Sequence, residues 1–143
     1  MRRLAYVLEN HPWQFLILNV LAILSIYYAL HKEQVLELIL KGVLTFTIAS
    51  VTVLIIKILT KRRRWDIRTI QDYRFPSYHQ ATATSLCVLA GIYMPLLIPW
   101  FIGLIILTAW GRYVIEKHTL DEIAVGAIVG AIAALAIGLS NIR

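Results

Sequence analysis

The sequence predicts an all-α protein, an integral membrane helical bundle with about five transmembrane helices in a single domain, residues 1–143. Of the 143 residues, 59% are hydrophobic and only 15% are charged, and the mean hydropathy is +0.74. A soluble domain averages about 45–50% apolar and about 25% charged residues. The apolar residues also fall into runs of about 20, the length of helix that crosses a bilayer. Together these observations favour a membrane protein.

The first two predicted helices lie in the amino-terminal half. Residues 13–30 are apolar apart from three polar residues, with aromatic side chains at both ends, as suits the membrane interfaces. After a short polar turn, a second helix runs from Val35 to Thr60, and Glu37 and Lys41 form an i,i+4 pair in its first turns. Lys57, about one turn before its end, is expected to extend toward the interface.

The third and fourth helices follow the long polar segment. The third begins near residues 77–79, after a proline and a serine, and continues to Tyr93. Pro95 and Pro99 bracket a tight turn, and the fourth helix spans residues 100–114.

The fifth helix, residues 120–139, carries Gly126 and Gly130 in a Gly-x-x-x-Gly pattern, which permits close packing of helices. Counting the crossings brings three polar segments to the same membrane face, and ionisable residues gathered there indicate a functional site. The polar residues predicted on that face are Lys57, Arg64, Ser77, His79, Arg112, His118 and Glu122.

Charge limits the class of partner that the sequence predicts, and the cysteine content bears on the core. A net charge of +6 and a pI of about 9.7 would suggest nucleic acid for a soluble protein. Here the basic residues cluster in residues 61–68, which favours anionic lipid headgroups or a phosphate substrate, and no nucleic-acid partner is expected. The single cysteine, Cys87, lies in an apolar run and is expected to be a small buried side chain. The sequence leaves the oligomeric state open.

Residues 111–122 hold the groups best suited to chemistry. If a helix starts at Thr119, His118 and Glu122 lie four residues apart on one face. The carboxylate can then accept the proton of one imidazole nitrogen and leave the other free as a nucleophile. Arg112 would donate to an anionic target. The alternative is a basic loop followed by the acidic first turn of a helix, which also explains Asp121 and Glu122.

The start of the third helix is a second candidate. Backbone N–H groups at a helix N-terminus form an anion site, and the Ser77 hydroxyl adds a donor. His79, in the first turn, can reach an anion bound there. As a lone residue, His79 would more often lie at the membrane interface.

Three segments resemble, in order, the motifs of the type 2 phosphatidic acid phosphatase superfamily, which also includes vanadium haloperoxidases. Its first motif is a lysine, six residues and arginine-proline; Lys57 and Arg64 match, and Trp65 replaces the proline. Its second motif is proline-serine-glycine-histidine. Residues 76–79 match this motif with Tyr78 in place of the glycine.

The third motif is serine-arginine, five residues, histidine, three residues and aspartate. Arg112 and His118 match, Gly111 replaces the serine, and Glu122 replaces the aspartate. The resemblance covers residues 57–126, nearly half of the chain.

The resemblance implies hydrolysis of a phosphate ester without a metal or cofactor. His118 would attack phosphorus to form a phosphohistidine, and Glu122 would orient it, with Asp121 as a possible substitute. His79 would protonate the leaving oxygen and then activate water. The phosphoryl oxygens would be held by Lys57, Arg64, Ser77, the backbone N–H groups near Tyr78, and Arg112.

Two departures from the motifs have structural consequences. Tyr78 fits only if its φ is negative and its ring points away from the phosphate. Gly111 removes a hydroxyl donor, which would lower the rate or alter phosphate affinity.

Other kinds of protein fit part of the pattern. A catalytically inactive membrane protein could bind anionic lipid headgroups through the same basic face, but it would not need His118 and His79 together. A metal site built from these histidines and a carboxylate would crowd a divalent cation among three basic residues. A haloperoxidase is not expected in so small a membrane chain, and vanadate should inhibit as a phosphate mimic.

The predicted substrate is a lipid phosphate or pyrophosphate, such as a polyprenyl pyrophosphate, phosphatidic acid or phosphatidylglycerophosphate. No residue distinguishes the lipid tails, although the many basic residues in 61–68 favour a pyrophosphate or a crowded headgroup. Family members often face away from the cytoplasm. The positive-inside rule instead places this site on the cytoplasmic face of a multi-pass protein of the cell membrane.

Overall fold

The computed structural model describes residues 27–28, 34–60, 75–115 and 117–140. Its elements are the helices α3 (Val35–Thr60), α4 (Tyr78–Tyr93), α5 (Ile98–Val114) and α6 (Leu120–Gly138), and the short 3-10 turn η3 (Pro95–Leu97). Regular structure in these ranges is entirely helical, which confirms the all-α prediction. Most of the predicted first helix, and the basic segment 61–68, lie outside the described residues.

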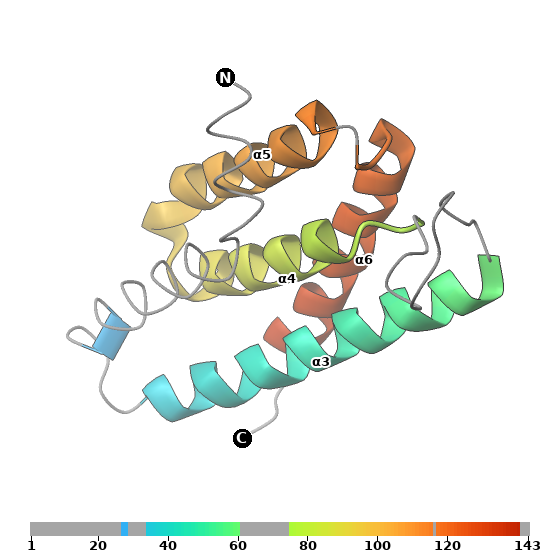
Figure 1. Ribbon diagram of the computed structural model, residues 1–143. Helices are drawn as coiled ribbons and strands as arrows, with labels where there is room; N and C mark the ends of the chain where they lie inside the picture. The colour runs from blue at the N-terminus through green and yellow to red at the C-terminus, as the bar shows by residue number, and fades with distance from the viewer. Residues whose placement is uncertain (1–26, 29–33, 61–74, 116, 141–143) are drawn as a thin grey trace.

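Helix α4 is the centre of the described bundle. It lies between α3 and α5 and is crossed by α6 (Figure 1), and it contacts all three, α6 most extensively. Its sequence explains this position, because many of its residues are small (alanine, serine, threonine and glycine) and let neighbouring backbones come close. Ala81 and Ser85, one turn apart, are both completely buried.

Among the described residues, three helical segments are long and apolar enough to cross a membrane: Val35–Thr60, Pro95–Val114 and Leu120–Gly138. Most of their exposed side chains are apolar, as suits contact with lipid. On α3, for example, Leu40, Leu44 and Ile48 are exposed, whereas Thr45 and Ala49 face the bundle and are fully buried. The chain is therefore a helical membrane bundle, with the shorter α4 enclosed by the other helices.

Two predicted helix boundaries needed correction. The fourth helix begins at Ile98 and not at residue 100, because Pro99 occupies its first turn, where a missing N–H costs no intrahelical hydrogen bond. The last helix ends at Gly138, one residue earlier than predicted, and Leu139 is its C-cap. The third helix begins within the predicted window, at Tyr78.

The Gly-x-x-x-Gly pattern packs α6 against α4, as predicted. A Cβ atom at Gly126 would lie 2.5 Å from the carbonyl oxygen of Ser77. A Cβ atom at Gly130 would overlap the carbonyl oxygen of Ala81. Only glycine allows α6 to come this close to α4 without moving one of the two backbones.

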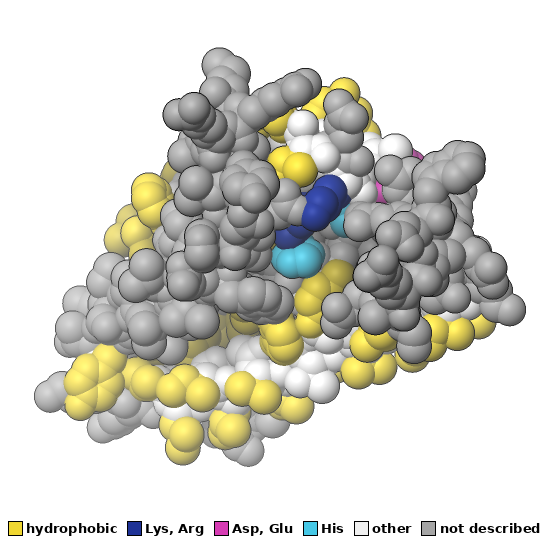
Figure 2. Space-filling model, viewed as in Figure 1, with side chains coloured by type: hydrophobic (Ala, Val, Ile, Leu, Met, Phe, Trp, Pro, Cys, Tyr) yellow, Lys and Arg dark blue, Asp and Glu magenta, His cyan; other side chains and the backbone are white. Residues whose placement is uncertain are grey.

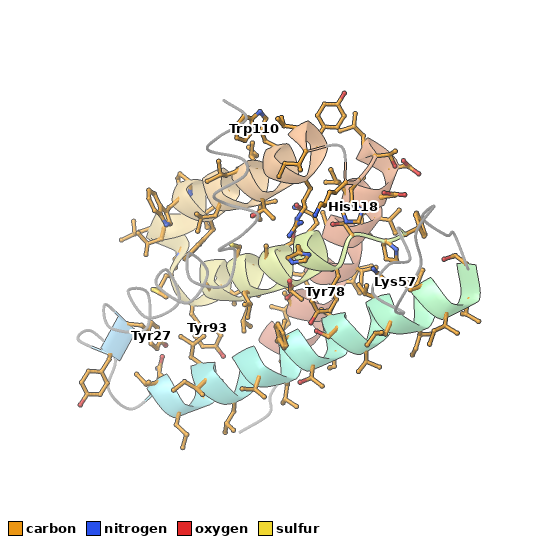
Figure 3. All side chains as sticks on the ribbon, viewed as in Figure 1. Tyr27, Lys57, Tyr78, Tyr93, Trp110 and His118 are labelled. Atoms are coloured by element: carbon orange, nitrogen blue, oxygen red, sulfur yellow. The ribbon has the colours of Figure 1, made fainter. Side chains whose placement is uncertain are left out.

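A polar cluster joins three helices near the start of α3 and the carboxyl ends of α4 and α6. Lys41 Nζ lies 2.9 Å from Glu37 Oε1, which confirms the predicted ion pair, and it donates to the carbonyl oxygen of Ser140 at 2.9 Å. The Tyr93 hydroxyl donates to the same Glu37 oxygen at 3.0 Å. Figure 3 shows Tyr93 toward one end of the bundle and His118 toward the other. The cluster thus fixes α3, α4 and α6 at a distance from the candidate site.

Candidate active site

His118 is held by the first turn of α6. Its Nδ1 atom lies 3.0 Å from Glu122 Oε2, and both side chains are buried. The same carboxylate oxygen accepts the backbone N–H of Thr119 at 3.1 Å. Glu122 is the third residue of α6, so its side chain turns back toward the residues that precede the helix. The start of α6 therefore orients the carboxylate, and the carboxylate contacts the histidine.

Asp121 occupies a different position. It is exposed, and one of its carboxylate oxygens accepts a hydrogen bond from the Thr119 hydroxyl. Sequence spacing alone left both acidic residues open as partners of His118. In the structure, the buried carboxylate at hydrogen-bonding distance belongs to Glu122.

The amino end of α4 lies against this pair. The Ser77 N–H donates to the carbonyl oxygen of Glu122 at 3.0 Å. Ser77 is completely buried, makes no side-chain cap bond to α4, and its Oγ has no hydrogen-bond partner. The first N–H groups of a helix have no acceptor within the helix. Hydroxyl and amide donors thus lie beside His118 and Glu122, an arrangement suited to an anion.

Arg112 is brought to the site by the turn between α5 and α6. It lies in the last turn of α5, it is buried, and its carbonyl oxygen accepts the His118 N–H at 3.4 Å. This contact joins the backbones of the two residues, so the buried arginine adds positive charge to the same end of the bundle.

Lys57 was expected to extend toward the membrane interface, but its side chain is turned into the bundle. It is only 4% exposed, because it continues the buried stripe of α3 that faces the bundle. Two contacts place this part of α3 beside the start of α4. Ser50 Oγ lies 3.0 Å from the Tyr78 hydroxyl, and the Thr60 hydroxyl contacts the Phe75 carbonyl oxygen at 3.5 Å. Packing of α3 on α4 therefore turns this lysine inward.

Tyr78 and His79 open α4. Tyr78 adopts a helical conformation, and its hydroxyl is hydrogen-bonded to Ser50 of α3, so its ring points toward α3. The half-buried His79 ring lies edge-on to it, at 6.0 Å between ring centroids. Figure 2 shows Lys or Arg side chains next to His side chains at the surface near the centre of the view. Figure 3 shows Lys57, Tyr78 and His118 on the same side of the bundle.

The structure thus brings together six of the predicted site residues by direct contact or by helix packing. They are Lys57, Ser77, Tyr78, Arg112, His118 and Glu122. Arg64 lies outside the described residues. Sequence analysis missed Thr119, which orients Glu122, and Gln80, which is buried one turn after Ser77. The pattern serine or threonine, two residues, then glutamate or glutamine marks both helix starts and would have identified them.

Within the described ranges, no three His, Cys, Asp or Glu side chains are grouped closely enough to hold a metal ion. The donors found at the site are a hydroxyl, backbone amides and cationic side chains, which complement an anion.

Fold and site together define an all-α membrane protein with a buried histidine–carboxylate pair, an open helix start and cationic side chains at one end of its bundle. The sequence model of the PAP2 superfamily matches residues 17–140, and the chain belongs to this superfamily. Membership supports a hydrolase, a phosphatase of the lipid phosphatase type in general terms. No curated protein and no solved structure matches the chain significantly.

A charge-neutral replacement of Glu122 should impair hydrolysis. In Glu122→Gln the side chain keeps its length, but an amide no longer stabilises a positively charged imidazole, so we expect phosphate release to fall by roughly 10²-fold or more. Asp121→Asn is the matched control, because it changes an exposed neighbouring carboxylate in the same way, and it should remain within about twofold of wild type. Equal rates in the two variants would contradict a role for Glu122.

A serine can be restored at Gly111. Gly111 is buried, but a Cβ atom there would meet none of the described residues within 4 Å, so their packing can accept Gly111→Ser. Serine is also a better helix former than glycine by about 0.5 kcal/mol. We expect an unchanged or higher melting temperature and a KM lower by about threefold, because one hydroxyl donor is added to the anion site. A higher KM would show that the glycine is required.

Proposed function

We propose that the chain is a membrane lipid phosphatase. It hydrolyses a lipid phosphate or pyrophosphate in two steps through a phosphohistidine, without a metal or cofactor. The observation that carries this proposal is the buried His118–Glu122 pair, 3.0 Å apart, beside the unpartnered hydroxyl of Ser77. A nucleophile oriented by a carboxylate and a cluster of donors for phosphoryl oxygens are the two parts that such a reaction needs.

In the first step His118 attacks phosphorus. With the proton on Nδ1 donated to Glu122, the lone pair of Nε2 is available as the nucleophile. The N–P bond forms as the bond from phosphorus to the leaving oxygen breaks. The imidazole becomes cationic, and the Glu122 carboxylate stabilises that charge, as the third member of a catalytic triad does.

His79 transfers the protons. Because it lies two residues after Ser77 in the first turn of α4, it shares the side of the bundle on which the phosphate binds. It protonates the leaving oxygen in the first step. In the second step it takes a proton from water, which attacks phosphorus and breaks the N–P bond.

Cationic groups and helix donors hold the phosphoryl oxygens. Lys57 and Arg112 are buried, and electrostatic interactions there are stronger than in bulk water. Arg112 offers a planar, bidentate fork and Lys57 a compact charge. Arg64, the Ser77 hydroxyl and the first N–H groups of α4 complete the set.

The substrate class and the orientation extend the proposal. The substrate is a polyprenyl pyrophosphate, phosphatidic acid or phosphatidylglycerophosphate, and the site faces the cytoplasm, as the basic residues of 61–68 favour. A cysteine placed at position 70 should then react with a membrane-impermeant thiol reagent only after the cells are opened. Labelling in intact cells would show that the site faces away from the cytoplasm.

The proposal is tested by phosphate release from these lipids, presented in detergent micelles to the purified protein with and without a chelator. We expect turnover of at least one lipid phosphate, insensitive to the chelator and inhibited by orthovanadate. If none is hydrolysed while orthovanadate still binds, the chain is an inactive binder of anionic headgroups. Chelator-sensitive turnover would contradict the metal-independent mechanism.

A further inference from the structure

Helices α4 and α6 begin with the same sequence pattern but use it differently. Ser77 and Gln80 stand at the N-cap and third positions of α4, as Thr119 and Glu122 do at α6. In a capping box, the side chain at the third position accepts the N–H of the N-cap residue. Glu122 does this, accepting the Thr119 N–H at 3.1 Å. Gln80 does not accept the Ser77 N–H, which donates to the Glu122 carbonyl oxygen at 3.0 Å.

The Gln80 side chain is instead directed into the bundle. Its Nε2 atom donates to the Thr84 hydroxyl oxygen at 3.2 Å and to the carbonyl oxygen of Ile105 in α5 at 3.4 Å. A carbonyl oxygen can only accept, so the contact with Ile105 fixes which end of the carboxamide faces α5. The residue is only 1% exposed.

Two polar atoms in this region are buried without hydrogen-bond partners, Gln80 Oε1 and Ser77 Oγ. Closing the capping box would use both residues, since the Ser77 hydroxyl would accept the N–H of Gln80. A buried polar atom without a hydrogen-bond partner lowers the stability of the folded protein. The structure therefore keeps the start of α4 open at a cost in stability.

The contact with α5 also links Gln80 to a cationic residue of the site. Ile105 and Arg112 are seven residues apart, about two helical turns, and lie on the same face of α5. The hydrogen bond from Gln80 to Ile105 therefore ties the helix that carries Arg112 to the helix that carries Ser77.

We propose that Gln80 is a positioning residue that keeps the amino end of α4 open for the substrate's phosphoryl group. Helix α5 holds the carboxamide away from the helix start, so the Ser77 hydroxyl and the first N–H groups of α4 stay available to phosphoryl oxygens. The same contact keeps Arg112 in register with them. This inference rests on the proposed phosphatase function.

Gln80→Glu tests the proposal because a glutamate side chain should favour the start of α4 over the contact with α5. A carboxylate cannot donate to the Ile105 carbonyl oxygen, and a negative charge is favoured at a helix N-terminus. It should turn to the start of α4, compete with the phosphate and repel it. We expect the Kd for orthovanadate and the KM to rise by about tenfold or more, kcat to change less, and the melting temperature to stay equal or rise.

Gln80→Leu separates positioning from packing. Leucine removes the contact with α5 but cannot cap α4, so it should lower the melting temperature and raise the orthovanadate Kd by only about threefold. Thr108→Val is the matched control. It removes a side-chain hydrogen bond to the Leu104 carbonyl oxygen within α5, 2.8 Å long, and should leave orthovanadate binding unchanged.

Parallel losses of melting temperature and orthovanadate affinity in Gln80→Glu and Gln80→Leu would overturn the proposal, since they would show a packing role only. Wild-type affinity in Gln80→Glu would overturn it as well. Failure of the phosphatase assignment looks different: the wild-type protein itself would then release no phosphate from any of the lipids, whether or not it binds orthovanadate.

Discussion

Replacing His118 by alanine should reduce phosphate release by on the order of 10⁴-fold or more, because the variant lacks the atom that forms the bond to phosphorus. The residual rate would come from binding and from the donors at the start of α4. KM should change little, since the cationic residues and Ser77 remain. Initial rates at saturating lipid phosphate, measured on purified protein, give the comparison.

His31→Ala is the control for this variant. It removes a histidine that the sequence places in a short polar turn away from the three motif segments. Its rate should equal that of the wild type. Comparable rates in the His118 and His31 variants would exclude His118 as the nucleophile.

Gly130→Ala should cause the largest loss of stability. A Cβ atom there would overlap the Ala81 carbonyl oxygen and lie 3.0 Å from the Ser85 nitrogen, and backbone atoms cannot yield as a flexible side chain does. Helix α6 must therefore move away from α4, at a cost of about 1–3 kcal/mol. We expect the melting temperature in detergent to fall by roughly 5–10 °C.

Gly103→Ala is the matched control, because a Cβ atom at this exposed position of α5 would meet nothing within 4 Å. Alanine is the better helix former, so the melting temperature should stay the same or rise slightly. A melting temperature for Gly130→Ala equal to that of Gly103→Ala would contradict the close packing of α6 on α4.

The helices were largely predictable because their signals are local. Apolar runs and prolines gave the described helices to within two residues, although Pro99 was counted with the turn when it belongs to the first turn of α5. The central position of α4 was not predictable. Its small and polar residues are informative only once the other helices surround it, and the same packing turns Lys57 inward.

The candidate site, like the fold, was only partly predictable from the sequence. The residue types and their order were readable from the three motif segments. The distinction between Asp121 and Glu122 was not, because both lie within reach of His118 by spacing. It follows from the cap geometry of α6, in which Glu122 contacts both the Thr119 N–H and the imidazole. The role of Gln80 depends on a contact with α5 that no local pattern encodes.

Detecting a phosphoryl group on His118 tests the central claim most directly. The wild-type protein and a His79→Asn variant would be mixed with p-nitrophenyl phosphate, whose leaving group departs without a general acid, quenched in alkali and mapped by peptide mass spectrometry. We expect an acid-labile phosphoryl group on His118, more abundant in the variant, because the second step lacks its base. An unmodified His118 during turnover, or a phosphoryl group on another residue, would contradict the mechanism.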